Sequence, residues 1–329
     1  MAKIVRFHET GGPEVLRLEE GDPGKPGPGH ALVKIDAIGL NRGEAAFRGG
    51  HYIVKPTLPS VIGSEASGRI VAVGDGVKDF KPGDAVFTIP TFPTGQYGVC
   101  ATETVLPVSA LVKLPDGLDP IQSAATWVAF LTAYGGLVDQ GKIAKDAFVL
   151  ITAASSSVGL AAIQIARDQG AVVIAATRGR AKVEAIAKAG AAHVIATDEQ
   201  DIEAEVMRIT GGKGVGFIFD PVAGPQAEKL FALLSDGGEL MIYGGMANQP
   251  HTFPRQLSIR KNLTMRGYSF FPLLMDKQRF AAAYDYILDR VRDGRFVMPV
   301  DSTFPLERVA DAHRALEANK HIGKIVITT

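Results

Sequence analysis

Between residues 148 and 267, short apolar runs alternate with segments in which apolar residues recur at helical spacing. The apolar runs are Phe148–Ala153, Val172–Ala176, His193–Ile195, Val215–Phe219, Glu239–Tyr243 and Leu263–Gly267. The helical segments are Val158–Ala166, Arg180–Ala189, Asp201–Thr210 and Pro225–Leu234. The runs do not alternate apolar with polar positions, which is typical of strands buried on both faces. Strands alternating with helices predict right-handed crossovers and a six-stranded, doubly wound parallel sheet.

The first 120 residues follow a different pattern, with short apolar runs separated by glycine and proline. Ala31–Ile38, Ser67–Val73 and Asp84–Ile89 are expected strands, and this punctuation is densest at Gly21–Gly29. Gly323–Thr329 (GKIVITT) predicts one more strand near the C-terminus. Since the parallel sheet already has six strands, we expect this strand to return to the β-rich part. The predicted fold class is therefore α/β, with a doubly wound parallel sheet and a β-rich part.

Composition narrows the range of partners. Lys and Arg total 35 and Asp and Glu total 35, so no net basic field is present and nucleic-acid binding is not expected. The single cysteine, Cys100, excludes a disulfide within the chain and fits a reducing, cytoplasmic location. Two windows with little charge, Pro120–Val138 and Ala147–Ala166, are expected to be buried core rather than membrane spans.

The segment Ala153–Gly159 (AASSSVG) lies between the first strand and the first helix of the alternating region. A dinucleotide-binding (Rossmann) fold has a tight turn there, where backbone N–H groups and a helix N-terminus meet a pyrophosphate. The residues expected to bind the cofactor are Ser155, Ser156, Ser157, Val158 and Gly159. Because serines stand at the early glycine positions of G-x-G-x-x-G, a plain turn is one alternative. A serine-hydrolase elbow, followed by Asp220 and His251 in the required order, is another.

The second strand ends at Thr177, where an NAD-binding fold would carry an acidic residue for the ribose 2′-hydroxyl. Three cations follow instead, Arg178, Arg180 and Lys182. A guanidinium group gives planar, charge-assisted hydrogen bonds to a 2′-phosphate, which an acid would repel. Thr177 and these three residues therefore predict NADPH rather than NADH. The alternative interpretation is a solvated helix start.

The later strands complete the predicted cofactor edge, because ligands of open α/β sheets bind outside the carboxyl ends of the strands. The segments at these ends are Asp220–Val222, Gly244–Met246 and Tyr268–Phe270. From them we expect cofactor contacts by Val222, Gly244, Gly245, Ser269 and Phe270.

Several motifs along the whole chain resemble the medium-chain dehydrogenases/reductases, specifically their zinc-free quinone oxidoreductase branch. The matching segments are Ala37–Asn41 (AIGLN), Gly63–Gly68 (GSEASG), Val73–Val77 (VGDGV), Lys81–Asp84 (KPGD), Ala153–Gly159, Ile209–Gly214 (ITGGKG) and Gly323–Val326 (GKIV). The resemblance implies a chaperonin-10-like, β-rich catalytic domain at 1–120 and 269–329. It also implies a Rossmann domain at 121–268, with one cleft between the two domains.

The resemblance bears on metals as well. In the family's zinc-dependent alcohol dehydrogenases, a Cys, a His and a second Cys hold the catalytic metal. The corresponding positions here are Asn41, Ser64 and Val128, none of which suits zinc. The four-cysteine lobe that holds structural zinc in those enzymes is also missing, so we expect no metal. The serine-rich turn further departs from the Ala-Gly-Gly-Val-Gly pattern of the zinc-free branch.

By the same resemblance Tyr52 lies near the nicotinamide and Asn41 and Thr132 line the same cleft, so these three are the expected catalytic residues. Simple packing roles are the alternatives for Tyr52 and Thr132. Without a metal to stabilise an alkoxide, the expected reaction is NADPH-dependent hydride transfer to a small quinone or α,β-unsaturated carbonyl. The alternatives are a zinc-free alcohol or aldehyde oxidoreductase and a non-catalytic NADPH-binding protein. The predicted edge strand Leu263–Gly267, together with the resemblance, predicts a homodimer.

Overall fold

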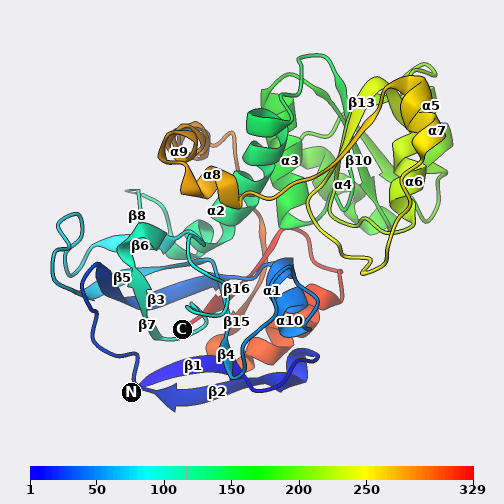
Figure 1. The fold of residues 1–329 in the computed structure, drawn as a ribbon. Coiled ribbons are helices and arrows are strands. Elements are labelled where there is room, and N and C mark those ends of the chain that lie inside the picture. The colour runs from blue at the N-terminus through cyan, green and yellow to red at the C-terminus, as the bar shows by residue number, and fades with distance from the viewer. Residues whose placement is uncertain (116) are drawn as a thin grey trace. The chain divides into compact units, whose positions relative to one another are not determined.

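The computed structural model describes residues 1–115 and 117–329. They divide into two compact units, a first unit of residues 1–128 with 298–329 and a second unit of residues 129–297. The colours of Figure 1 show that both chain termini lie in the same unit. The boundaries between the two units lie after residues 128 and 297, later in the chain than the predicted boundaries after residues 120 and 268.

The second unit is built on a six-stranded parallel sheet, as predicted from the apolar runs. Its strands are β9 (Phe148–Ile151), β10 (Val172–Thr177), β11 (His193–Ala196), β12 (Val215–Asp220), β13 (Leu234–Ile242) and β14 (Thr264–Gly267). The spatial order is β11-β10-β9-β12-β13-β14, with every neighbouring pair parallel. The direction of winding reverses between β9 and β12, and open α/β sheets bind ligands at such a point. Strand β13 starts five residues before the predicted run, because Leu234 pairs with Val215 ahead of a register shift.

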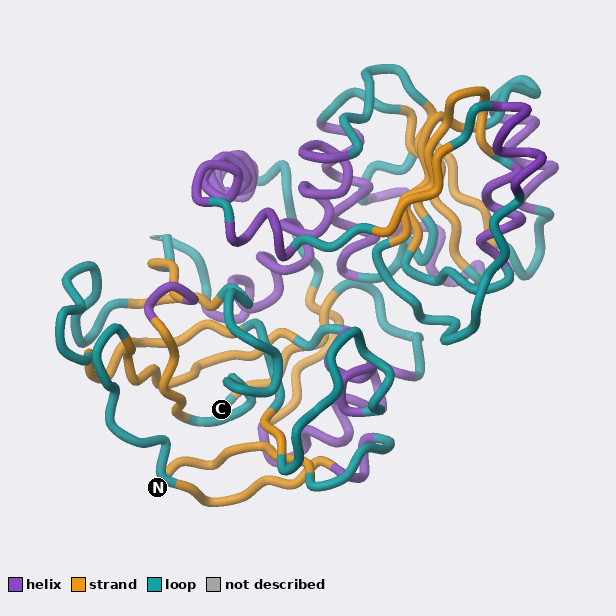
Figure 2. Tube along the Cα trace, viewed as in Figure 1, coloured by secondary structure: helices purple, strands orange, loops and turns teal. Residues whose placement is uncertain are grey.

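Helices and short helical turns connect the strands. They are α3 (Ser157–Asp168), η4 (Arg180–Lys182) with α4 (Val183–Lys188), α5 (Ile202–Ile209), α6 (Gln226–Ala232) and α7 (Arg255–Lys261). The predicted helices are confirmed at all four places. On one face of the sheet, Ile218 and Leu240 pack with Val206 of α5 and Leu230 of α6. Figure 2 shows helices on both sides of this sheet.

Two helices after residue 268 belong to the second unit, although the sequence placed that segment in the β-rich domain. They are α8 (Phe271–Met275) and α9 (Lys277–Arg292). The Tyr286 hydroxyl and the Arg290 guanidinium of α9 both donate to the Asp168 carboxylate of α3, at 2.6 and 2.7 Å. The Phe296 ring stacks on Phe130 with centroids 5.0 Å apart. These contacts hold residues 269–297 in the second unit.

Helix α2 (Pro120–Tyr134) continues into the π-helical segment η3 (Gly135–Gln140). By length and composition this stretch could cross a membrane, but 78% of its most apolar window is buried inside the structure. Core helices pass the same test, so the buried-core interpretation of Pro120–Val138 fits the fold. Near its middle, Trp127 stacks on Phe87 with centroids 4.3 Å apart.

The first unit contains two sheets. A three-stranded sheet has β1 (Ala2–Phe7) between β2 (Leu16–Gly21) and β4 (Ser60–Val61). A seven-stranded sheet contains β3 (His30–Gly39), β5 (Ala66–Val73), β6 (Ala85–Thr88), β7 (Glu103–Pro107), β8 (Leu111–Lys113), β15 (Val300–Pro305) and β16 (Lys324–Thr328). Strand β16 pairs antiparallel with β3, so the predicted return of the last strand is confirmed.

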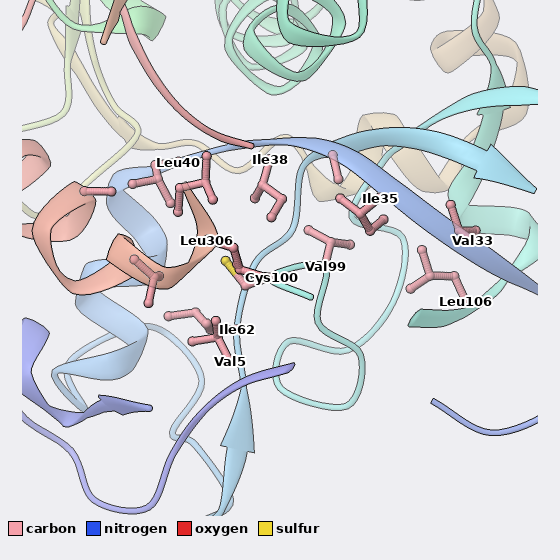
Figure 3. Packing of buried hydrophobic residues seen from close by; sticks show 14 of the residues in the cluster. Val5, Val33, Ile35, Ile38, Leu40, Ile62, Val99, Cys100, Leu106 and Leu306 are labelled. Atoms are coloured by element: carbon pink, nitrogen blue, oxygen red, sulfur yellow. The ribbon is translucent and has the colours of Figure 1, made fainter. Parts of the chain in front are cut away.

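The core of the first unit fills the space between its sheets and two helices, α1 (Arg42–Arg48) and α10 (Val309–Glu317). Figure 3 shows Val5, Ile35, Leu40 and Leu306 among the side chains that meet around Cys100. Burial raises the pKa of the Cys100 thiol well above its usual range. This cysteine is therefore a small core residue rather than a reactive thiolate.

Candidate cofactor and substrate site

The turn after β9 is a tight corner. Ala153 adopts a left-handed conformation with φ of +45°, and the Ser156 N–H closes the turn on the Ala153 carbonyl at 3.0 Å. A Cβ added to Gly159 would lie 2.7 Å from that carbonyl oxygen. Gly159 is the glycine of the motif that this chain retains, and its lack of a side chain lets α3 pack closely against the turn.

Serine hydroxyls line this corner. Ser156 caps α3, because its Oγ accepts the Gly159 N–H at 3.1 Å. The Ser155 Oγ accepts from the Lys182 ammonium at 3.1 Å, while Ser157 and Val158 form the partly exposed first turn of the helix. The unpaired N–H groups and the positive end of the helix dipole make this corner suited to an anion.

The three predicted cations lie together after β10 but have different partners. Arg178 is exposed, and its side chain forms no ion pair or hydrogen bond with any residue that the structure describes. Arg180 lies 3.4 Å from Glu199 and is 82% exposed, whereas Lys182 bonds to Ser155. Thr177 is buried, and its carbonyl accepts the Thr197 N–H at 2.8 Å. Arg178 is therefore the cation of this group that is available to a phosphate.

The remaining predicted cofactor residues follow the carboxyl ends of β12, β13 and β14. They are Val222, Gly244, Gly245, Ser269 and Phe270. A Cβ at Gly244 would lie 2.7 Å from the Pro221 carbonyl oxygen, whereas Gly245 has open space around it. Because all the strands are parallel, these residues share one edge of the sheet with the serine-rich turn. The arrangement expected from the sequence is confirmed, while the role of each residue stays a prediction.

The hydrolase alternative lacks its catalytic geometry. Asp220 is fully buried and accepts the Ala223 N–H at 2.6 Å, the Val222 N–H at 3.2 Å and the Thr152 hydroxyl. His251 is exposed. In the part of the chain that the structure describes, neither residue bonds to a serine of the turn. Asp220 instead orders the backbone after β12, and burial raises the pKa of its carboxyl.

The first unit contains a buried ion pair that the sequence did not single out. The Lys324 ammonium lies 2.6 Å from the Glu65 carboxylate, and the two side chains are 0% and 1% exposed. Lys324 also donates to Asn41 Oδ1 at 2.8 Å, while Asn41 Nδ2 donates to Glu65 at 3.1 Å and to the Gly39 carbonyl at 3.2 Å. The second Glu65 oxygen accepts the Val128 N–H at 2.8 Å. The Asn41 amide is thereby locked in one orientation.

A second buried carboxyl, Glu44, lies beside this ion pair. One of its oxygens accepts the Ser64 N–H at 3.0 Å and the Ser64 hydroxyl at 2.9 Å, and the other accepts the Asn41 N–H at 3.3 Å. Burial raises the pKa of Glu44 to about 7, although Ser64, Asn41 and Lys324 act in the opposite direction. Glu44 can therefore hold or lose a proton near neutral pH.

Tyr52 is half-buried beside α1. Its ring meets Phe47 edge to face, with centroids 6.5 Å apart, and a Cβ at Gly43 would lie 3.2 Å from the ring. Burial, and secondarily the negative charge of Glu44, raise the pKa of Tyr52, so its hydroxyl stays protonated. No hydrogen bond of this hydroxyl is present among the residues described. Tyr52 thus offers a free donor in the first unit.

Thr132, the third predicted catalytic residue, lies in the second unit and is buried in α2. Its carbonyl accepts the Tyr268 hydroxyl at 3.0 Å. This contact secures the end of α2 against the segment after β14.

The residues at the zinc positions of the family do not fit a zinc ion. The Asn41 amide is occupied by the ion pair, the Ser64 hydroxyl by Glu44, and Val128 has no ligand atom in its side chain. A buried ammonium already balances the charge of Glu65. The residues described contain no group of three His, Cys, Asp or Glu side chains placed to hold a metal.

The sequence offered only weak signals for Glu44, Glu65 and Lys324. Glu65 and Lys324 stand inside matching motifs, but neither had an assigned partner. The pair is separated by 259 positions along the chain, and no periodic pattern links residues at that distance.

Comparison with known proteins agrees with the two-unit architecture. Residues 27–116 match the family model "Alcohol dehydrogenase GroES-like domain", and residues 157–288 match "Zinc-binding dehydrogenase". A quinone oxidoreductase of Pongo abelii is 34% identical over 334 residues, covering 99% of this chain and 98% of that protein. A 2-haloacrylate reductase of a Burkholderia species is 32% identical, with 99% and 98% covered.

The fold also matches solved structures. The Escherichia coli quinone oxidoreductase complexed with NADPH superposes with a TM-score of 0.92 at 28% identity, covering 99% of this chain and 100% of that one. Sequence similarity and fold similarity thus extend over essentially the whole chain. The chain belongs to the quinone oxidoreductase branch of the medium-chain dehydrogenases/reductases and is an oxidoreductase.

Proposed function

We propose that this protein transfers a hydride from NADPH to a quinone or to an activated alkene such as an α,β-unsaturated carbonyl, without zinc. The cofactor assignment rests on Arg178, whose side chain is exposed and has no partner among the described residues. With Arg180 and Lys182, it stands at the point where an NAD-specific fold has an acidic residue. The related structure from Escherichia coli, which was solved with NADPH, supports it. The names of the related reductases support the acceptor class.

The residues present fit the dinucleotide. The hydroxyls and N–H groups of residues 155–159 would meet its diphosphate, and Arg178 its 2′-phosphate. When bound, the cofactor supplies the hydride. The protein then has to stabilise the negative charge that develops on the acceptor oxygen. We assign this role to the protonated hydroxyl of Tyr52, while water can supply the final proton.

The choice between quinones or activated alkenes and simple carbonyl compounds as hydride acceptors follows from the lack of suitable zinc-binding side chains at Asn41, Ser64 and Val128. A simple alkoxide needs a strong electrostatic partner, which zinc provides in metal-dependent dehydrogenases. A quinone or enone spreads the added charge by conjugation, so hydrogen-bond donors can suffice. This argument favours quinones and activated alkenes over a zinc-free alcohol or aldehyde oxidoreductase. The similarity to named reductases favours an enzyme over a non-catalytic NADPH-binding protein.

The direct test is a screen of NADPH oxidation with quinones, enones, enals, haloacrylates and simple aldehydes, with and without EDTA. We expect turnover of quinones or activated alkenes that survives the chelator, and no stoichiometric zinc by elemental analysis. Oxidation of simple alcohols without any quinone or alkene turnover would contradict the acceptor class. One bound zinc per chain in washed protein would contradict the metal-free mechanism.

Replacing Arg178 by alanine is expected to raise KM for NADPH about tenfold and to leave KM for NADH unchanged. A hydrogen bond to a charged group contributes about 1.5–3 kcal/mol, and the lower end applies because Arg178 is exposed. Steady-state kinetics with both cofactors measure the effect. Arg208→Ala is the matched control, because Arg208 is an exposed arginine in the last turn of α5, paired with Glu205. Equal losses with NADPH and NADH would remove Arg178 from phosphate recognition.

We further propose a homodimer that uses the free edge of β14, the last strand of the parallel sheet. Light scattering at micromolar concentration is expected to give twice the chain mass of 34.8 kDa. A monomer mass would refute this assembly. A cytoplasmic location, suggested by the single cysteine, likewise stays a prediction that cell fractionation can check.

A further inference from the structure

Glu44 is a buried carboxyl whose hydrogen-bond partners are all donors. It lies in the first turn of α1 and is 6% exposed. One of its oxygens accepts the Ser64 hydroxyl at 2.9 Å and the Ser64 N–H at 3.0 Å, and the other accepts the Asn41 N–H at 3.3 Å. These three hydrogen bonds suit an ionised carboxylate, which accepts and does not donate.

A protonated Glu44 needs a different arrangement, because a carboxyl O–H must donate when it is buried. Backbone N–H groups cannot accept a hydrogen bond, so the Ser64 oxygen is the one acceptor among these three partners. The contact of 2.9 Å between the two side chains therefore reverses its direction when Glu44 takes up a proton. Glu44 then donates to Ser64 Oγ, and the Ser64 proton is free to point elsewhere.

Ser64 is the link between this buried carboxyl and the surroundings. Ser64 is partly exposed, whereas Glu44 is buried behind it. The Tyr52 ring lies against the same turn of α1, since a Cβ added to Gly43 would be 3.2 Å from the ring and 3.5 Å from its hydroxyl oxygen. The hydroxyl assigned above to the acceptor oxygen and the Ser64–Glu44 pair thus border adjacent residues of one helical turn.

Several charged or titratable groups face Glu44. Burial has the largest effect and raises the pKa of Glu44 to about 7, while the Lys324 ammonium lowers this pKa and the Glu65 carboxylate raises it. Tyr52 and Cys100 are neutral, and burial with the charge of Glu44 raises the pKa of each. Tyr52 is therefore a weaker acid than an ordinary phenol, and Glu44 is the group of this cluster that exchanges a proton near neutral pH.

We propose that Ser64 and Glu44 together deliver the proton that completes reduction of the acceptor. The proposal rests on the proposed function and adds a proton source to it. After hydride transfer the acceptor carries an extra electron pair and a negative charge. The Ser64 Oγ–H bond breaks as its proton moves to this anion, and the Glu44 proton moves to Ser64 Oγ. Glu44 is left as a carboxylate and takes up a proton from water before the next turnover. Ser64 contacts the acceptor, and Glu44 acts through it.

The test is the pH dependence of kcat at saturating NADPH, with one quinone and one enone. For the unaltered protein we expect kcat to fall as the pH rises through about 7, because ionised Glu44 holds the Ser64 proton. Ser64→Ala and Glu44→Gln should each lower kcat at about pH 6 about a hundredfold, the lower end for general acid catalysis, because water can replace the donor. Both variants should lose the dependence on pH, which a merely structural role would leave in place.

Combining Ser64→Ala with Glu44→Gln should cause no further loss, since the two residues act as one unit. Ser67→Ala is the matched control, because it removes a hydroxyl of the same unit that donates to the Pro120 carbonyl at 2.7 Å. This variant should keep both kcat and the pH profile. A measured Tm shows which variants fold, and Ser64→Ala decides alone if Glu44→Gln does not.

Two results would overturn the proton-delivering pair while leaving the proposed function intact. One is a kcat of the unaltered protein that is constant from about pH 6 to about pH 9, and the other is a Ser64→Ala variant that keeps both kcat and its pH profile. A complete absence of quinone and enone turnover by the unaltered protein is a distinct result. It would overturn the proposed function, and the proton pair with it.

Discussion

Replacing Lys324 by methionine is expected to lower the free energy of unfolding of the first unit by about 3–5 kcal/mol. Lys324 is fully buried and pairs with Glu65, which is 1% exposed, at 2.6 Å. Methionine fills the same space but leaves the Glu65 carboxylate as an unpaired charge away from water. Trp127, the single tryptophan, is buried in the first unit and lets urea unfolding of that unit be followed by fluorescence.

The matched control is Lys3→Met, which breaks a pair with Glu307 whose side chains are 48% and 54% exposed. Exposed pairs contribute about 0–1 kcal/mol, so this variant should unfold close to the original protein. Adding Glu65→Leu to Lys324→Met should recover part of the loss, because it removes the stranded charge. If Lys324→Met shifts the urea midpoint no more than Lys3→Met does, the ion pair does not stabilise the fold as argued.

Replacing Tyr52 by phenylalanine is expected to lower kcat for quinone or enone reduction about ten- to a hundredfold, since each factor of ten corresponds to about 1.4 kcal/mol. The substitution keeps the edge-to-face contact with Phe47 and removes only the hydroxyl. Because that hydroxyl forms no hydrogen bond with the residues described, its loss should not destabilise the fold. The expected loss falls on kcat, since charge on the acceptor oxygen develops in the transition state.

Tyr97→Phe provides the control for Tyr52→Phe. It makes the same chemical change in the first unit, at a hydroxyl that pairs with His30 Nε2 at 3.1 Å. Its kcat and KM should match those of the original protein. An unchanged kcat/KM in Tyr52→Phe would remove the tyrosine from the mechanism and leave solvent as the donor to the acceptor oxygen.

Local patterns in the sequence were sufficient to predict the parallel sheet and to predict which edge of the sheet would face the cofactor. Strands such as Phe148–Ile151 and Val172–Thr177 are apolar throughout because both faces are covered, and that pattern is visible in the chain itself. Parallel strands put their carboxyl ends on one edge, so the sequence alone groups the serine turn, Arg178 and Gly244. The β-rich part was recognised as a class, but its strand pairing was not.

Where the second boundary falls could not be predicted from local patterns. Helix α9 joins the second unit through Tyr286 and Arg290, which bond to Asp168 of α3 more than a hundred positions earlier. A boundary drawn from the end of the last parallel strand therefore missed residues 269–297. The signal lies in contacts between distant segments, not in the composition of the segment itself.

The sequence by itself determined the α/β class, the six-stranded sheet, and the positions of the serine-rich turn and of the cations after the second strand. These follow from the periodicity of side chains and from the chemistry of single residue types. The unsuitability of Asn41, Ser64 and Val128 for zinc followed from the family resemblance, which assigned those positions. Only the tertiary structure decided that Lys324 neutralises Glu65 and that both lock Asn41. Which side chains become buried and paired depends on which distant segments come into contact. In a low-dielectric interior, these contacts decide whether a buried polar or charged group stabilises or destabilises the fold.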